Sequence, residues 1–339
     1  MERIPLAIWI TDLHLSLKTM ETVKYIFKQV QELCSQMENP TLILGGDIFD
    51  SRSGQPQEVL TCFTKILQEL EQNNIKTLCI GGNHDKVSYV SEDSYLDAYS
   101  GWNQFFLIKD YFTINVSEHG LRFHFIPYFD EKLTYGSYLA QAGTNLDLTK
   151  KNILFTHIAI SGVKNNDGSR VENNLTKNSF KDFHRVVVGH YHNRQAFDNI
   201  LYTGSAYQAN FGEDHQKGCS VVFSDGSIEF LKLDFPEYKT QKFTINEFLS
   251  LDEETDFNTE GMNLRLKIQG KPDFEQSKKI QRLEQRGIKI ECEYEVVTQL
   301  GVEDVKSSFT DKDIEEYFEE WCALEDIQDK QYGLDLLSK

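Results

Sequence analysis

Histidine, aspartate and asparagine side chains repeatedly follow short apolar runs of this sequence. Grouped by the run that precedes them, the candidates are Asp12 and His14, Asp47 and Asp50, Asn83 and His84, His157, and His190 and His192. Carboxylate, amide and imidazole ligands together suit Mn, Fe or Zn better than Ca. Two such ions ~3.5–4 Å apart can clamp a phosphate and activate a water molecule for in-line attack. The residue types therefore predict a hydrolytic site with two divalent metal ions.

The spacing within these groups favours a shared site. Asp12 and His14 are two residues apart, as are His190 and His192, and in extended chain such residues point to the same side. The carboxylate of Asp47 has two oxygens, so it could bridge two ions. A single histidine at a strand end is most often structural, but five of the nine histidines lie at such ends beside Asp or Asn. The others, His119, His124, His184 and His215, are interpreted as structural or surface residues.

Apolar runs and helical periodicity alternate along the first eighty residues. Strands are expected at 6–10, 41–44 and 76–80, and amphipathic helices at 19–37 and 57–72. This alternation predicts an α/β fold with a mostly parallel sheet. Further strands are expected at 121–129, 152–158, 185–190, 199–205, 219–224 and 227–235. Ligands bind at the carboxyl ends of strands in open α/β sheets, so the candidate side chains should meet there.

The composition changes after residue 238. Residues 240–261 are polar and acidic, and a small β-α-β unit is expected from 263 to 297. The last part, about 307–337, is typical of an acidic amphipathic helix with a break near Gly333. We therefore expect three parts, at 1–238, 239–300 and 301–339.

The net charge of −18 argues against a protein that coats nucleic acid with a broad basic surface. It leaves room for an enzyme that holds phosphate through metal ions, because the ions supply positive charge. No segment approaches the ~20 consecutive apolar residues of a membrane helix. The six cysteines form no CxxC pair, which indicates reduced thiols in a cytoplasmic protein.

Five short segments, DLH, GGDIFD, GGNHD, TH and GHYH, occur in this order at predicted strand ends. Together they resemble the signature motifs of the calcineurin-like metallophosphoesterases, over residues 6–192. The resemblance implies a β-sandwich flanked by helices in α/β/β/α layers. It also implies two ligand sets: Asp12, His14, Asp47 and His192 for one ion, and Asp47, Asn83, His157 and His190 for the other. His84 would stay off the metals and serve the reaction itself.

A later stretch narrows the resemblance. Gly204-Ser205, the FGE of 211–213 and Lys217-Gly218 are similar to the segment that closes the nuclease domain of the Mre11/SbcD family. That family implies 3'-to-5' exonuclease activity on duplex DNA and endonuclease activity on single strands, with Mn²⁺ favoured and Mg²⁺, Fe²⁺ or Zn²⁺ as alternatives. It also implies a capping domain at 239–300 that binds DNA and an ABC-type ATPase partner, Rad50 or SbcC. The chain length suits the bacterial or phage form, and hence a bacterial or phage-infected host cytoplasm.

Asp50 and His84 are the predicted catalytic pair. The resemblance is to bacterial-type members, in which an aspartate at position 50 could accept a hydrogen bond from the His84 ring and favour its protonated form. Protonated His84 could then donate to the leaving 3'-oxygen as a general acid. The alternative for Asp50 is a cap or turn residue before SRSGQP.

DNA contacts and a homodimer are further expectations. Lys18, Arg52 and Lys86 lie near the motifs and could touch the DNA backbone, although cations on loops are usually only solvated. The family resemblance implies a homodimer, formed through helices near the site such as 56–72 or 92–102.

The acidic tail is a candidate binding element for the ATPase partner. Tyr317, Phe318, Trp321 and Leu324 share one face at helical spacing and could anchor that contact. The partner would then supply much of the basic DNA-binding surface. The other interpretation is that this helix packs on its own domain.

Two other functions stay open on the sequence alone. One is a nucleotide phosphodiesterase or a protein phosphatase on the same scaffold, which the C-terminal hundred residues and the closing segment count against. The other is a structural subunit whose site no longer turns over, which the complete ligand set counts against.

Overall fold

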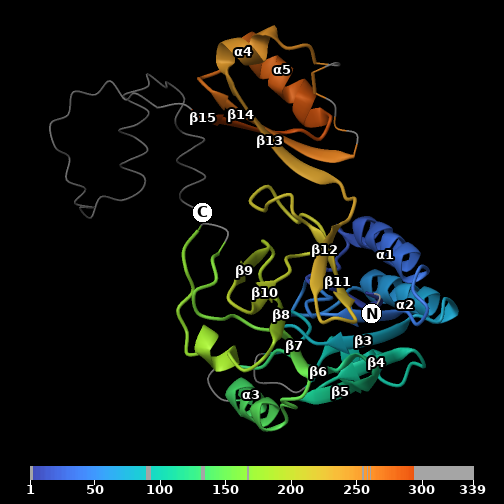
Figure 1. Ribbon diagram of the computed structural model, residues 1–339. Helices are drawn as coiled ribbons and strands as arrows, with labels where there is room; N and C mark the ends of the chain where they lie inside the picture. The colour runs from blue at the N-terminus through green and yellow to red at the C-terminus, as the bar shows by residue number, and fades with distance from the viewer. Residues whose placement is uncertain are drawn as a thin grey trace, which may run out of the picture. The chain divides into compact units, whose positions relative to one another are not determined.

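The computed structural model describes residues 3–293, apart from 89–92, 131–133, 166–167, 254–255, 258 and 260 (Figure 1). The predicted tail contacts at Tyr317, Phe318, Trp321 and Leu324 lie outside the described residues. Among the helices of the described part, none has the length and apolar character that a membrane crossing needs.

The first large sheet has the strand order β12-β11-β1-β2-β3-β4. Its strands are β1 (Pro5–Ile10), β2 (Thr41–Leu44), β3 (Lys76–Ile80), β4 (Phe105–Ile108), β11 (Gly218–Phe223) and β12 (Ile228–Lys232). Neighbours β1 to β4 are parallel, whereas β11 runs antiparallel to β1. Helices α1 (Met20–Cys34) and α2 (Gln57–Gln72) cover one face, because alternate strand residues such as Ile8 and Leu42 pack with the apolar sides of both helices.

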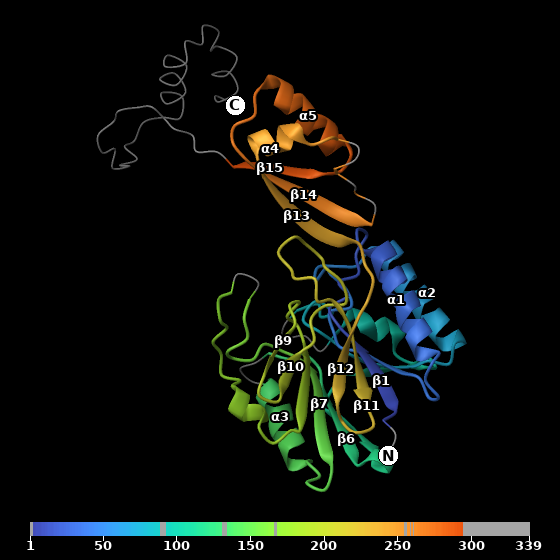
Figure 2. The same ribbon diagram turned by 45° about the horizontal axis from the view of Figure 1, so that its top comes forward.

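The second large sheet has the order β5-β6-β7-β8-β10-β9. Its strands are β5 (Phe112–Val116), β6 (Leu121–Ile126), β7 (Lys151–His157), β8 (Arg185–Gly189), β9 (Gln195–Phe197) and β10 (Ile200–Tyr202). Helix α3 (Thr134–Thr144) packs on its outer face, on the side away from α1 and α2 (Figures 1 and 2).

The two large sheets face each other across a shared apolar layer. Trp9 from β1 and Phe155 from β7 meet there, with ring centroids 5.5 Å apart. Residues on either side of them in sequence point to the helices instead, so these strands are buried on both faces. This burial explains their continuous apolar runs. The predicted sandwich of sheets flanked by helices is confirmed.

A third, parallel sheet is formed by β13 (Glu237–Thr244), β14 (Met262–Gln269) and β15 (Lys289–Glu293). Helices α4 (Ile245–Ser250) and α5 (Phe274–Gln285) lie on one face of it and enclose a core of its own (Figure 2). The sequence predicted β14, α5 and β15 but missed β13, because most of its residues are polar and only partly buried. The predicted boundaries at 238 and 300 stay predictions.

Glycines bring the strand ends into direct contact. A Cβ atom on Gly45, at the end of β2, would lie 2.3 Å from Cζ2 of Trp9. One on Gly82, after β3, would lie 2.2 Å from Oδ1 of Asp47, and one on Gly189 would lie 2.4 Å from Oγ1 of Thr11. Only residues without side chains allow these strands to approach so closely at the edge where the candidate residues converge.

We therefore expect Gly45→Ala to destabilise the protein. Trp9 is completely buried and its Nε1 donates to Thr203, so the ring cannot move aside cheaply. Overpacking of this kind costs about 1–3 kcal/mol in free energy of unfolding, which urea unfolding of the full chain would measure. Gly143→Ala is the control, because Gly143 is exposed in α3 with open space around it. Equal stability of the two variants would contradict the close packing at Gly45.

Candidate active site

Unusual backbone conformations mark the ends of three strands. Asp12, His14, Asp47 and His190 have φ angles of 54°, 43°, 50° and 91°. Residues other than glycine rarely adopt such angles, and they persist at functional sites where the surroundings enforce them. Here the enforcement comes from hydrogen bonds between loops, because the amides of Asp12 and His14 donate to the carbonyls of Gly46 and Asp47, both at 3.0 Å.

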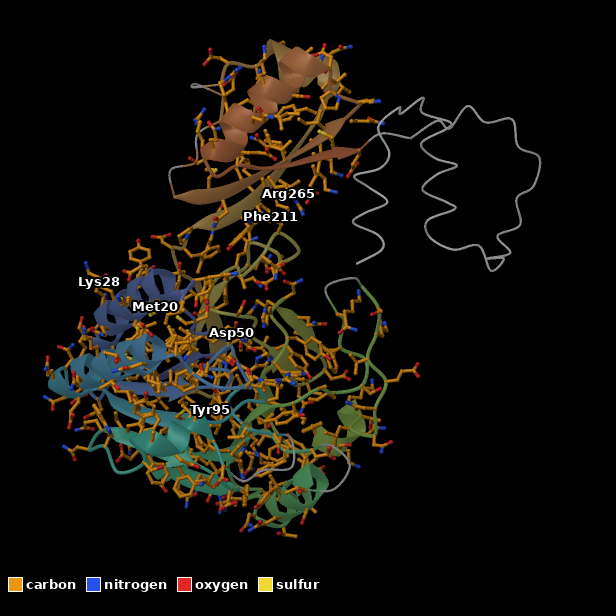
Figure 3. The ribbon with its side chains drawn as sticks, turned by 180° about the vertical axis from the view of Figure 1, so that it is seen from behind. Met20, Lys28, Asp50, Tyr95, Phe211 and Arg265 are labelled. Atoms are coloured by element: carbon orange, nitrogen blue, oxygen red, sulfur yellow. The ribbon has the colours of Figure 1, made fainter. Side chains whose placement is uncertain are left out.

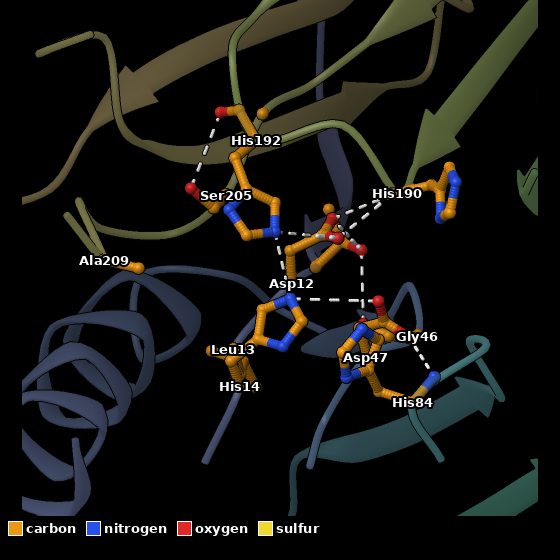
Figure 4. A network of polar contacts seen from close by, with 12 residues as sticks. Asp12, Leu13, His14, Gly46, Asp47, His84, His190, His192, Ser205 and Ala209 are labelled. Carbon is orange, nitrogen blue, oxygen red and sulfur yellow. Dashed lines mark hydrogen bonds and ion pairs between the residues drawn. The ribbon is translucent and has the colours of Figure 1, made fainter. Parts of the chain in front are cut away.

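One cluster consists of Asp12, His14 and His192 (Figure 4). Each offers a ligand atom, and these atoms all lie within 4.8 Å of one another. Nε2 of His14 lies 3.0 Å from Nε2 of His192, and the latter lies 3.8 Å from Oδ1 of Asp12. Side chains from the ends of β1 and β8 therefore face a common point.

A second cluster consists of Asp47, His157 and His190, again with ligand atoms within 4.8 Å. Asn83 belongs with it, because its Oδ1 lies 2.7 Å from Nδ1 of His190 and 3.3 Å from Nε2 of His157. Oδ2 of Asp47 lies 3.4 Å from Nε2 of His157 and 3.8 Å from Nε2 of His14. One carboxylate thus lies between the clusters, as the bridging prediction requires.

The electrostatics of the two clusters fit divalent cations. Burial alone would lower the pKa of His14, but the carboxylates of Asp50, Asp47 and Asp12 outweigh it and raise the pKa to about 9. Burial would likewise lower the pKa of His157, but the Asp47 carboxylate outweighs it and the pKa rises to about 9. Protons on these rings supply positive charge beside buried carboxylates, and a bound metal ion would replace them. The donor set of four imidazoles, two carboxylates and an amide suits two such ions.

His84 makes a different contact from the one expected. Its amide donates to Oδ1 of Asp47 at 2.8 Å, and its ring Nδ1 lies 2.6 Å from the main-chain carbonyl of Asp50. The Asp50 carboxylate instead lies 3.4 Å from Nδ1 of His14. The predicted partner atom for the His84 ring was therefore wrong. Burial lowers the pKa of His84, against the opposing charge of Asp47, so the expected stabilisation of a protonated ring is not found.

Asp85, the next residue, connects two of the motif loops. Its Oδ1 accepts from the amides of Ile48 and Phe49 at 2.9 and 3.0 Å, and its Oδ2 accepts from Gly82 at 2.8 Å. The side chain is completely buried, and burial together with the Asp47 charge raises its pKa to about 6. Asp85 therefore fixes the loop after β2 to the loop after β3.

A cavity of about 680 Å³ opens over both clusters. Lys18 and Arg52, two of the predicted DNA contacts, line it, together with His84. Lys86, the third, does not fit that prediction, because its side chain is buried and its ammonium lies 4.2 Å from the ring centroid of Phe129. A lysine inside a motif loop can pack inward, which its position in the sequence did not reveal.

The wall of this cavity also includes residues outside the five motifs. Tyr238 from β13 and Asn263 from β14 line it. Nearby, the guanidinium of Arg265 in β14 lies 4.6 Å from the ring centroid of Phe211 (Figure 3). Segments after residue 203 thus line the cavity together with residues from four of the five motifs.

Sequence reasoning missed the role of Glu213. This residue entered only as a letter of the FGE segment, yet its Oε1 lies 2.8 Å from Nδ1 of His192. Burial would raise its pKa, but the hydrogen bond and charge of His192 and the charge of Lys217 lower it to about 2. Its place within FGE was the available signal in the sequence. That signal did not identify His192 as its partner, because the two residues meet only in the folded chain.

Comparisons with known proteins agree with this geometry. The family described as Calcineurin-like phosphoesterase matches residues 7–194, more than half of the chain. The SbcD component of the nuclease SbcCD from Staphylococcus epidermidis is 27% identical over 235 residues, which cover 60% of this chain and 60% of that relative. The chain thus matches less than two thirds of that protein's length.

Two solved structures show weaker similarity. A dimetal phosphatase from Danio rerio has 10% identity and a TM-score of 0.41, covering 65% of this chain and 92% of that chain. Nuclease MPE from Pseudomonas putida has 13% identity and a TM-score of 0.30, covering 66% and 87%. Neither value carries a functional assignment. The motif order, the converging strand ends and the match over residues 7–194 together place this chain in the calcineurin-like phosphoesterase family.

Proposed function

We propose that this protein is a metal-dependent DNA nuclease, the nuclease component of an Mre11–Rad50 or SbcCD type complex. The observation that carries the proposal is the convergence of seven ligand side chains, five of which line one open cavity together with His84. The similarity to a protein named as part of the SbcCD nuclease supports the choice of DNA as substrate. The activity would include 3'-to-5' exonuclease cleavage of duplex ends and endonuclease cleavage of single strands.

The ligand side chains would hold two divalent ions, with Mn²⁺ as the favoured metal. Asp12, His14 and His192 would hold one, Asn83, His157 and His190 the other, and Asp47 both. When bound, such ions orient a phosphate and lower the pKa of a water molecule. The chain's own contribution is to fix these ligands through the strained strand ends and through Asp85.

His84 would transfer a proton to or from the leaving oxygen. A carbonyl can only accept, so the contact with Asp50 places a proton on Nδ1 of His84 and leaves Nε2 for substrate. Protonated at Nε2, the ring can donate to a departing 3'-oxygen, and when neutral it can accept a proton there. Asp50 acts on His84 through its main chain and on His14 through its carboxylate.

Lys18 and Arg52 would contact the phosphate backbone at the cavity wall. The net charge of −18 makes further basic surface from an ATPase partner a natural complement. A homodimer, that partner and a cytoplasmic location stay predictions from the family resemblance.

The substrate class can be tested directly on the full chain. After metal removal with EDTA, the protein should cleave neither duplex nor single-stranded DNA, and added Mn²⁺ should restore cleavage. A nucleotide phosphodiester and a phosphopeptide, assayed in parallel with Mn²⁺ and Mg²⁺, should be poor substrates. Rapid hydrolysis of either without DNA cleavage would assign the chain to another branch of the family.

His84→Ala should lower kcat on DNA by about 10²–10⁴-fold, the range for loss of a general acid or base. Mn²⁺ stoichiometry, measured by calorimetric titration, should stay at two ions per chain, because His84 is not a proposed ligand. His119→Ala is a matched control outside both clusters. Full nuclease activity in the His84 variant with both ions bound would overturn the proposed role.

Asp50→Ala should have a smaller effect than His84→Ala. The alanine retains the main-chain carbonyl that orients the His84 ring, so only the carboxylate beside His14 is lost. We expect a loss in kcat below about tenfold, or ~1.4 kcal/mol. A loss as large as that of His84→Ala would show that the carboxylate acts on His84 after all.

A further inference from the structure

His192 is held from behind by residues outside the five motifs. Its Nε2 faces the metal cluster, 3.0 Å from Nε2 of His14, while its Nδ1 lies 2.8 Å from Oε1 of Glu213. Its main-chain carbonyl accepts from the amide of Ser205 at 3.0 Å, from the Ser205 hydroxyl at 3.5 Å (Figure 4) and from the ammonium of Lys217. The imidazole ring and the main-chain carbonyl of His192 are therefore both fixed by the segment that precedes β11.

Glu213 and Lys217 form an ion pair with no exposed side-chain surface. Nζ of Lys217 lies 3.2 Å from Oε2 of Glu213, and the same oxygen accepts from the amide of Ala209 at 3.1 Å. Oε1 also accepts from Nδ2 of Asn210 at 3.0 Å. Burying two charges costs free energy, so such a pair is weak evidence for stability alone. Its location directly behind a ligand suggests a use.

We propose that Glu213 is a positioning residue, which sets the tautomer of His192 so that Nε2 presents its lone pair to a metal ion. A carboxylate can only accept, so the proton of neutral His192 must lie on Nδ1 and Nε2 must be free of hydrogen. Histidine ligands in metal sites are held this way by a carboxylate on the other ring nitrogen. The inference rests on the two-metal function proposed above.

Lys217 has a separate part in this arrangement. It balances the charge of Glu213, and its ammonium also donates to the His192 carbonyl and, at 3.2 Å, to Oδ1 of Asn193. The donors around Oε2 of Glu213 are fixed, which leaves Oε1 facing the ring. Because both atoms of the carboxylate are oxygens, rotation of the group still presents an acceptor to Nδ1 of His192.

Glu213→Gln exploits these fixed donors. Lys217 and the Ala209 amide both donate to Oε2, and the Lys217 donor is charged, so the glutamine oxygen should occupy that position even though Asn210 also donates to Oε1. The NH₂ group of the glutamine should then turn toward His192. Nδ1 would then become the acceptor, and the ring proton would move to Nε2, where it blocks metal binding. Asp214→Asn is the matched control, since the next residue loses the same charge while its carboxylate bonds the Gln216 amide instead.

The test is calorimetric titration of the metal-free full chain with Mn²⁺, without DNA. In Glu213→Gln one of the two binding steps should weaken by about 10–100-fold, the usual effect of removing such a partner. The other step, and both steps in Asp214→Asn, should match the wild type. Long-range ¹⁵N–¹H spectra of histidine-labelled, metal-free protein should show the His192 proton on Nδ1 in the wild type and on Nε2 in Glu213→Gln.

A double variant, Glu213→Gln with Lys217→Met, separates positioning from charge balance. Lys217→Met removes the ammonium that Glu213→Gln leaves buried without a countercharge, so the thermal stability lost in Glu213→Gln should recover. Wild-type Mn²⁺ affinity in Glu213→Gln, or an unchanged His192 tautomer in that variant, would overturn the proposal. If the wild type binds two Mn²⁺ but cleaves no DNA, the nuclease proposal fails while the role of Glu213 stands.

Discussion

The carboxylate of Asp47 is the point on which the rest of the site depends. It is buried between His14 and His157, and it also accepts the amide of His84. A charge in that position is costly unless positive partners surround it. Imidazoles reach it from β1 and β7, and Gly82 lets the loop after β3 approach it. The two sheets thus bring together, around the buried carboxylate of Asp47, the side chains that can balance its negative charge.

Part of this architecture could be predicted from sequence because it depends on side-chain type and period. Continuous apolar runs identified the strands buried on both faces, and the polar residues just after them identified the site. Strand β13 escaped because mixed polar residues cover a half-exposed sheet edge. The short strands β4, β5 and β9 and helix α3 were also not predicted.

The misassigned contacts share a different cause. His84 is oriented by a main-chain carbonyl, and every residue has one, so no sequence pattern distinguishes the carbonyl of Asp50. Lys86 and Glu213 each carry a charge that usually indicates exposure, yet both are buried. Lys86 packs on the ring of Phe129, and Glu213 contacts the ring of His192, and neither partner is close in sequence. Side-chain types indicate which chemistry a site can hold, whereas atoms that orient those side chains become visible only in the fold.

Strand β1 has a consequence for how the protein is made. It carries Asp12 and His14 at its end and lies between β2 and β11, pairing Ile8 with both Leu42 and Val221. The strand that completes its pairing is therefore encoded some two hundred residues later in the chain. Such long-range pairing slows folding, because the intervening loop must be closed first. A chain on the ribosome that ends before β11 therefore carries all five motifs but lacks the strand that pairs with the second edge of β1.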